Sequence, residues 1–347
     1  MARLAVVTSH PPFTEGGHLV IARNLVTTLR DAGHDADLVL TPQNRFGRQA
    51  AAYLATWLTD VGESDGRRVD QVISLRFPSY AVRHLRHVCW LNHTMREYYD
   101  LWPAFRARIS WKGRIKEGLR RRLIHRADRW LLSPGRLTRL FVQSRTVQER
   151  IREAIGLEGD VLYPPPPARP YRCDGYGAYI FTVSRLTSHK RIDLLIRALA
   201  EPEGAGLRLV VAGDGEAREA LRSLAGALGV LGRVTLLGSV DQEVLLTHLA
   251  RCRAVAFTPL GEDYGFVTAE AFASGKAVIA CTDSGGPAEL IEHETTGLIV
   301  KPTPAALAGA LSRVADDEAF AERMGGAALR RVADMTWTAT LAKLVVV

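Results

Sequence analysis

The sequence has few cysteines and no long apolar run. Its four cysteines are far apart and include no C-x-x-C pair: Cys89, Cys173, Cys252 and Cys281. This spacing argues against a disulfide-stapled domain, a zinc ribbon or a redox motif, and it favours a reducing compartment. No stretch approaches the ~20 apolar residues of a membrane-spanning helix, and the apolar run at residues 4–7 is too short for a signal-peptide core. We therefore expect a cytoplasmic protein without a membrane span.

Composition and length are those of a folded chain with more than one domain. Apolar residues make up 47% and charged residues 24% of its 347 residues, which excludes a disordered tail. At roughly 150 residues per domain, this length predicts two domains. Lys and Arg number 45 against 37 Asp and Glu, and the excess of +8 predicts an anionic partner such as a nucleotide, a phosphate, a nucleic acid or an acidic lipid.

Short apolar runs alternate with amphipathic stretches along the chain. Strands are expected at residues 4–8, 37–41, 71–75, 88–91, 140–143, 179–184, 208–212, 234–237, 254–258 and 277–280. Helices are expected at residues 18–32, 104–129, 146–155, 191–200 and 217–228. This alternation is typical of parallel sheets covered by helices, as in doubly wound α/β domains.

A proline-rich segment divides this pattern in two. Five of the eight residues at 163–170 are proline, which fits neither a helix nor a central strand and suits a stiff connection between domains. We predict an N-terminal domain at residues 1–163, a hinge at 164–172 and a C-terminal domain at 173–336. A last helix at 337–347 is expected to pack back on the N-terminal domain. A cleft between two such domains is a favoured place for a ligand.

Two loops could hold an anion. Gly16 and Gly17 precede the first predicted helix, where free backbone amides favour negative charge and the absence of side chains allows close approach. In the loop from Ser184 to Lys190, two cations, Arg185 and Lys190, are near enough in sequence to converge on one diphosphate. Each feature alone is also common in ordinary turns or on solvated surfaces.

The most informative segment is G-E-D-Y-G-F-V-T-A-E at residues 261–270. It follows a predicted strand and enters a helix, so the amides of Phe266 and Val267 are expected at an anion-binding helix start. Glu270 lies among apolar residues, where a carboxylate is costly unless donors such as a pair of sugar hydroxyls satisfy it. Glu262 lies in the loop itself.

Taken together, these segments resemble a known enzyme family. The pattern from Glu262 to Ala280, preceded by V-S-R-L-x-x-x-K and A-G-D-G, is similar to that of the retaining glycosyltransferases of family 4, in the glycosyl transferases group 1. The resemblance covers most of the second domain, and in the first it rests on the Gly-Gly loop and a histidine after the fourth strand. It implies the GT-B fold, which has two Rossmann-like α/β domains and a cleft between them.

The resemblance implies roles for the charged residues. Arg185 and Lys190 match the basic pair that holds the donor diphosphate and stabilises charge on the departing phosphate. Glu262 matches the glutamate that faces the donor sugar, and Glu270 matches the one that bonds the ribose hydroxyls. Because fixed cations and helix amides can stabilise a departing phosphate in place of Mg²⁺, we expect no metal and no cofactor.

Other donor contacts are implied in the same way. Backbone groups of five residues are expected to touch the donor: Gly16, Gly17, Gly265, Phe266 and Val267. His93, in C-W-L-N-H-T, matches the histidine near the reacting sugar. The implied reaction moves a hexosyl group, mannosyl or glucosyl, from a nucleotide-diphosphate sugar to a hydroxyl of a glycan, a lipid-linked or a small-molecule acceptor, with retention by front-face attack. Cell-surface polysaccharide synthesis is the expected setting.

Other interpretations stay open. A sugar-nucleotide epimerase or a phosphorylase of the same build, or a nonenzymatic anion-binding module, would share the basic loop. G-D-G at residues 213–215 is only part of the dinucleotide fingerprint, because Arg218 takes the third glycine position. D-x-D at residues 35–37 lies at the start of a strand, on the wrong edge for a metal site, and the glycine pair at 285–286 is compatible with ordinary turn chemistry. No nucleic-acid-binding motif is present, and we expect no nucleic-acid partner.

The whole charge excess lies in one segment, residues 106–129. It contains ten basic residues and two acids: Arg106, Arg108, Lys112, Arg114, Lys116, Arg120, Arg121, Arg122, Arg126, Arg129, Glu117 and Asp128. Trp111, Ile115, Leu119 and Leu123 recur within it at helical spacing, as in an amphipathic basic helix that rests on an anionic membrane surface. The same stripe could instead pack on the sheet of the first domain while the cations are merely solvated. The sequence leaves both alternatives open.

Overall fold

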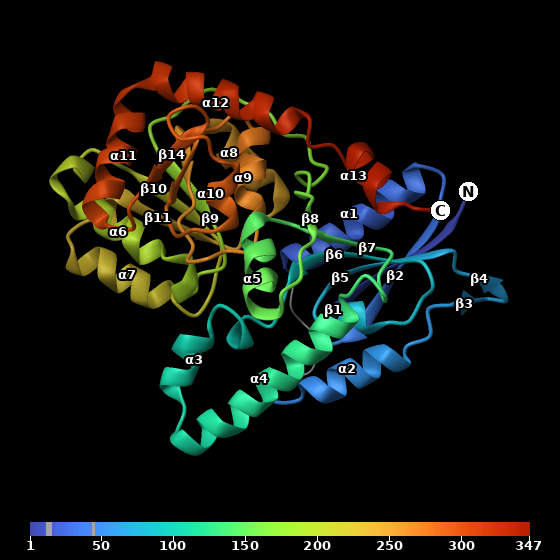
Figure 1. The fold of residues 1–347 in the computed structure, drawn as a ribbon. Coiled ribbons are helices and arrows are strands. Elements are labelled where there is room, and N and C mark those ends of the chain that lie inside the picture. Colours follow the sequence, from blue (N-terminus) through green and yellow to red (C-terminus); the bar gives the residue numbers. More distant parts are fainter. Residues whose placement is uncertain (12–15, 44–45) are drawn as a thin grey trace. The chain divides into compact units, whose positions relative to one another are not determined.

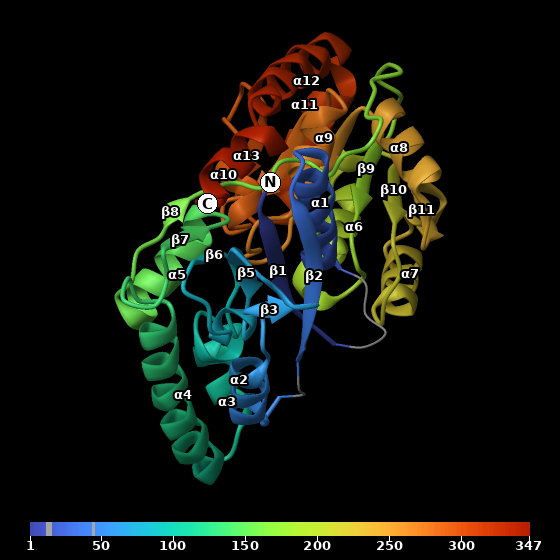
Figure 2. The same cartoon turned by 90° about the vertical axis from the view of Figure 1, so that its right-hand side faces the viewer.

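The computed structural model describes residues 1–11, 16–43 and 46–347. The chain forms two compact units, one of residues 1–164 with 336–347 and the other of residues 165–335. Each unit is built on a six-stranded parallel sheet with helices packed against it (Figures 1 and 2). This is the doubly wound α/β architecture that the alternation of strands and helices predicts.

The sheet of the first unit has the order β2-β1-β5-β6-β7-β8. Its strands are β1 (Arg3–His10), β2 (Asp35–Pro42), β5 (Gln71–Arg76), β6 (His87–His93), β7 (Arg139–Val142) and β8 (Asp160–Val161). Its helices are α1 (Gly17–Asp31), α2 (Gln49–Leu58), α3 (Trp102–Arg108), α4 (Trp111–Leu131), α5 (Arg145–Ile155) and α13 (Trp337–Leu344). A hairpin of β3 (Glu63–Ser64) and β4 (Arg67–Arg68) forms a separate small sheet. Strand β5 is buried along its whole length, which is why its sequence does not alternate between apolar and polar residues.

The sheet of the second unit has the order β11-β10-β9-β12-β13-β14. Its strands are β9 (Ile180–Val183), β10 (Leu209–Ala212), β11 (Val234–Gly238), β12 (Ala254–Ala256), β13 (Val278–Cys281) and β14 (Gly297–Val300). Its helices are α6 (Ile192–Ala200), α7 (Arg218–Ala227), α8 (Gln242–Arg251), α9 (Phe266–Ala273), α10 (Gly286–Leu290), α11 (Pro304–Asp316) and α12 (Glu318–Ala333). The direction of winding reverses between β9 and β12, which makes this pair the topological switch point of the sheet.

Helix α13 belongs to the first unit, although it ends the chain. At the start of β5, the Gln71 Nε2 atom donates to the carbonyl oxygen of Leu344 at 2.7 Å, and its Oε1 accepts from the amide of Val346 at 2.9 Å. Trp337 meets Trp90 edge to face, with ring centroids 6.3 Å apart. These contacts hold the chain end on the first sheet.

The sequence missed some elements and merged others. Helix α2 and strands β8 and β14 were not expected, and the expected helical region at 104–129 is two helices, α3 and α4. Ser110 separates them, because its hydroxyl accepts from the amide of Gly113 at 3.3 Å and so caps the start of α4. Among the described residues, no helix combines the length and apolar character needed to cross a bilayer.

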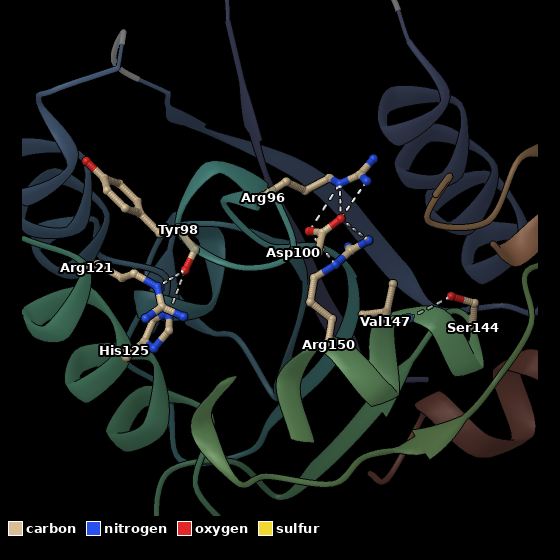
Figure 3. A network of polar contacts seen from close by, with 8 residues as sticks. All are labelled: Arg96, Tyr98, Asp100, Arg121, His125, Ser144, Val147 and Arg150. Atoms are coloured by element: carbon tan, nitrogen blue, oxygen red, sulfur yellow. Dashed lines mark hydrogen bonds and ion pairs between the residues drawn. The ribbon is translucent and has the colours of Figure 1, made fainter. Parts of the chain in front are cut away.

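The apolar side of helix α4 faces solvent, which contradicts one of our two expectations. The alternative in which its apolar stripe packs on the sheet is wrong, because the four side chains are 66%, 67%, 60% and 60% exposed: Trp111, Ile115, Leu119 and Leu123. The helix instead buries a face with two acids: Glu117, Ile124, Asp128 and Leu131. The main-chain carbonyl of Tyr98 fixes this orientation by accepting from Arg121 Nε and from His125 Nε2, each at 2.8 Å (Figure 3).

Three tyrosines surround the carboxylate of Asp128, which is fully buried. The hydroxyls of Tyr53 and Tyr80 donate to Oδ1, and the hydroxyl of Tyr99 donates to Oδ2 at 2.5 Å. Burial raises the pKa of Asp128, and the three hydroxyl bonds oppose that rise. Because the tyrosines come from three other segments, this carboxylate ties α4 to α2 and to the loops after β5 and β6.

Removing this carboxylate should destabilise the first unit. We expect Asp128→Ala to lower its free energy of unfolding by about 3 kcal/mol or more, because three buried hydroxyls lose their acceptor. Urea unfolding followed by tryptophan fluorescence is the measurement, since all six tryptophans lie in this unit. The matched control is Asp31→Ala, an exposed acid at the end of α1, which should change the unfolding free energy by less than about 0.5 kcal/mol. Equal effects of the two substitutions would contradict the anchoring role.

Candidate active site

The predicted basic loop and glutamate loop meet at the switch point of the second sheet. Strands β9 and β12 pair directly in parallel. The loop with Arg185 and Lys190 leaves the carboxyl end of β9, and the loop with Glu262 leaves that of β12. Open α/β sheets bind ligands in the crevice at this edge, where the chain departs to opposite sides.

Lys190 and Glu262 form an ion pair between these two loops. Lys190 Nζ donates to Glu262 Oε2 at 2.6 Å, and both side chains keep some contact with solvent. Arg185 is exposed, and its guanidinium makes no hydrogen bond or ion pair with any residue that the structure describes. Of the four charged residues that were predicted, the structure thus pairs Lys190 with Glu262 and leaves Arg185 available to a ligand, and Glu270 is described below.

The backbone of Glu262 is held by the loop after β13. Its amide donates to the carbonyl oxygen of Ser284 at 2.9 Å, and its own carbonyl accepts from the amide of Gly286 at 2.9 Å. Gly285 has a φ of 73°, and a Cβ atom there would lie 2.5 Å from the Glu262 carbonyl oxygen. The glycine pair at 285–286 therefore does more than make a turn, because a side chain at Gly285 would displace Glu262.

Arg191 joins three loops of the site and was not predicted. Its Nη1 and Nη2 atoms donate to the two carboxylate oxygens of Asp283 at 2.8 and 2.7 Å. Its Nε donates to the carbonyl of Thr258 at 2.8 Å, and Nη2 donates to that of Pro259 at 2.9 Å. The loops after β9, β12 and β13 are thereby fixed to one another. In the sequence, its position directly after Lys190 is the only signal.

Helix α9 begins at the predicted anion-binding position. Its N-cap, Gly265, has a φ of 75°, and a Cβ atom there would lie 2.6 Å from Phe257 Cε1 and 2.9 Å from Pro287 Cγ. A larger residue is therefore excluded both by conformation and by space. The amides of Phe266 and Val267 are in the first turn and have no acceptor within the helix, so they can bind an anion.

Glu270 is buried in the second turn of α9, 6% exposed. Its Oε1 atom accepts from Arg169 Nη1 at 2.5 Å and from the Tyr171 hydroxyl at 3.2 Å. Burial raises the pKa of Glu270, while the guanidinium and the hydroxyl act against the rise. Sequence reasoning expected donors for this carboxylate but missed these two, which come from the predicted hinge at residues 164–172, about 100 residues earlier.

The candidate residues of the first unit lie at the carboxyl edge of its own sheet. Gly16 is the N-cap of α1, with extended backbone, and Gly17 begins the helix, whereas residues 12–15 of the same loop lie outside the described residues. His93 ends β6 and is half-buried. The roles that the resemblance gives to these three residues stay predictions.

An unpredicted cluster of two arginines and one acid follows β6 (Figure 3). Arg96 Nη2 donates to Asp100 Oδ2 at 2.6 Å, and Arg150 Nε, from α5, lies 2.8 Å from Asp100 Oδ1. The Arg150 side chain is only 3% exposed. This cluster keeps one net positive charge near the strand end that carries His93. No group of three or more His, Cys, Asp or Glu that could hold a metal occurs among the residues described.

Comparisons with known proteins agree with the two-unit architecture. Residues 172–331 match the model of the family described as glycosyl transferases group 1. An uncharacterized glycosyltransferase of Methanocaldococcus jannaschii is 37% identical over 145 residues, which are 41% of this chain and 37% of that protein. The chain spans well under half the length of this relative and of other curated relatives.

Solved structures resemble the chain over nearly its whole length. Sucrose-phosphate synthase from Thermosynechococcus elongatus has a TM-score of 0.73 at 18% identity and covers 98% of this chain and 97% of its own. The Anabaena protein HepE, in complex with UDP-glucose, has a TM-score of 0.66 at 17% identity and covers 98% and 100%. At these identities the likeness concerns the fold. The chain therefore has the GT-B fold of two Rossmann-like units, and its second unit carries a domain of the glycosyl transferases group 1 family.

Proposed function

We propose that the protein is a retaining glycosyltransferase that moves a hexosyl group from a nucleotide-diphosphate sugar to an acceptor hydroxyl without a metal. The observation that carries this proposal is the Lys190–Glu262 ion pair at the switch point, beside the free amide end of α9. The family match of this unit and the UDP-glucose in the similar Anabaena structure support it. The free cysteines support a reducing, cytoplasmic setting.

Donor binding would exchange the partner of Lys190. When a diphosphate arrives, Lys190 Nζ can turn from Glu262 to a phosphate oxygen. The ion pair is partly exposed, so water can hydrate both side chains and little free energy is lost when the pair separates. Glu262 is then free to accept hydrogen bonds from the sugar hydroxyls. Arg185 and the amides of Phe266 and Val267 add positive charge around the phosphates.

Transfer then needs stabilisation of the leaving phosphate. The bond from the anomeric carbon to the phosphate oxygen breaks, and the acceptor oxygen bonds to that carbon on the same face. The acceptor proton passes to the departing phosphate oxygen, and the fixed cations stabilise the charge that remains. An epimerase or a phosphorylase of the same fold is the alternative, and the product formed from a nucleotide sugar separates them.

The basic loop should control turnover. After a thermal-shift screen of UDP- and GDP-sugars identifies the donor, we expect Arg185→Ala and Lys190→Ala each to slow its acceptor-free hydrolysis about 100-fold, since each removes a charge that stabilises the leaving group. The matched control is Arg197→Ala, an exposed cation on α6, which should keep the wild-type rate. Unchanged rates in both loop variants would contradict the site, and epimerised nucleotide sugar in place of hydrolysis would support the alternative.

Glu270 should set an acid limit to nucleotide binding. Its ionised form is the stronger acceptor for ribose hydroxyls, and burial raises its pKa, so affinity should fall as the pH drops through a value above the usual range of a glutamate. We expect Arg169→Ala to move this limit to higher pH, because the guanidinium opposes the rise. Binding of the diphosphate nucleotide measured calorimetrically against pH tests this.

A neighbouring arginine provides the control for that experiment. Arg172 lies in the same segment but is largely exposed and pairs with Asp174 at 2.9 Å. Arg172→Ala should leave the pH profile where it is, and Tyr171→Phe should shift it less than Arg169→Ala does. A profile that moves equally in the Arg169 and Arg172 variants would argue against a specific effect on Glu270.

A further inference from the structure

Helix α4 presents an apolar row to solvent in a structure whose other long helices bury theirs. Trp111, Ile115, Leu119 and Leu123 follow one another at i, i+4 spacing, so they lie on one side of the helix. All four are more than half exposed. Such a row normally faces the core. An exposed apolar surface of this kind marks an interaction site.

Cations alternate with this row on the same side of the helix. Lys116, Arg122 and Arg126 are exposed, and none forms an ion pair with any residue that the structure describes. The two acids of the segment point inward instead. Asp128 is bound by its three tyrosines, and Glu117 accepts from the Tyr98 hydroxyl at 2.6 Å. The outward side of α4 therefore carries only apolar and positive groups.

A groove runs beside this row, between α2 and α4. It has a volume of about 660 Å³ and is lined mainly by apolar side chains, among them Leu54 and Trp57 of α2 and Leu119, Leu123 and Trp130 of α4. Two further hollows, of about 540 and 470 Å³, adjoin the other side of α4 and also border Leu119. Lys116 and Arg120 also line the main groove, so its apolar interior has cationic neighbours.

Tryptophan is concentrated in the same part of the first unit. Four of the six tryptophans lie on α2, α3 and α4: Trp57, Trp102, Trp111 and Trp130. Indole rings favour the boundary between water and hydrocarbon, where one end is apolar and the other can donate a hydrogen bond. These four tryptophans lie on α4, which carries the cations and the apolar row, or on the neighbouring helices α2 and α3. This part of the first unit therefore combines the three side-chain types that favour such a boundary.

From these observations we infer that the outward side of α4 and the α2–α4 groove dock the first unit on an anionic lipid bilayer, with the groove taking a hydrocarbon chain. The cations face lipid phosphates while the apolar row enters the boundary between headgroups and chains. A bilayer fits better than a protein partner, because the outward side of α4 carries cations and apolar side chains with no acid among them, which complements anionic headgroups above a hydrocarbon layer. The inference concerns binding to a surface and does not require the transferase activity.

Vesicle flotation tests the docking directly. The full chain, without nucleotide sugar, is mixed with vesicles of phosphatidylcholine alone or of phosphatidylcholine with phosphatidylglycerol. We expect flotation only with the anionic vesicles and its loss at high salt. Because no donor is present, a failure here is separate from a failure of the transferase proposal, which the hydrolysis assay measures.

Surface variants assign the effect to α4. The triple variant Lys116→Ala/Arg122→Ala/Arg126→Ala should bind anionic vesicles about 100-fold more weakly, at about fivefold per charge. The variant Ile115→Ser/Leu119→Ser should also lose flotation. Matched controls in the second unit are Arg197→Ala/Arg222→Ala/Arg330→Ala and Leu329→Ser, which remove exposed cations and an exposed leucine and should float like the wild type. Unchanged urea midpoints verify that the variants fold.

The groove has its own readout. Phosphatidylglycerol vesicles with brominated acyl chains should quench the tryptophan fluorescence, because Trp57 and Trp130 line the groove. Flotation without quenching would overturn the part of the inference that concerns the chain. Equal binding to neutral vesicles, no binding to either kind, or a dimer in gel filtration that the α4 variants disperse would overturn the docking surface itself.

Discussion

The candidate donor site depends on the guanidinium of Arg191. It bonds two main-chain carbonyls after β12 and the carboxylate of Asp283 after β13, while its own backbone leaves the loop after β9. Three loops that come from separate strands are thus fixed by one side chain. Lys190 directly precedes Arg191, and Glu262 follows Pro259 by three residues, so the 2.6 Å Lys190–Glu262 contact joins two of the segments that Arg191 links. The rigidity matters because a cation stabilises a leaving group only if it is positioned before the bond breaks.

The parts of this site that were predictable are those that local sequence determines. The loops that follow parallel strands all lie at the same edge of the sheet. A glycine before a helix, a loop carboxylate and a loop cation are therefore close together when each follows one of these strands. The basic loop with Lys190, the loop that contains Glu262 and the start of α9 followed from that rule, whereas the role expected of Glu262 came from the family resemblance. Arg169 and Tyr171 could not be found in this way, because their contact with Glu270 bridges about 100 residues and no spacing pattern records it.

The orientation of α4 shows the limit of periodicity as a guide. A row of large apolar residues at i, i+4 predicts that one side of a helix is buried in something, but the row reads the same whether it faces a sheet or a membrane. What decides is the opposite side, where Asp128 and Glu117 find tyrosine hydroxyls. Those donors come from α2 and from the short turns after β5 and β6, so only the tertiary structure reveals that the polar side is the inner one.

The buried carboxylates of the two units differ in whether both of their oxygens have a hydrogen-bond donor. Asp128 receives three neutral donors spread over both oxygens, which satisfies it without any ligand and suits a permanent anchor. Glu270 receives both of its donors on Oε1, and one of them is a guanidinium that favours the ionised form. Its second oxygen has no donor among the described residues. In the proposed function, a ribose hydroxyl of the nucleotide donates to this oxygen and adds the hydrogen bond that the described residues do not supply.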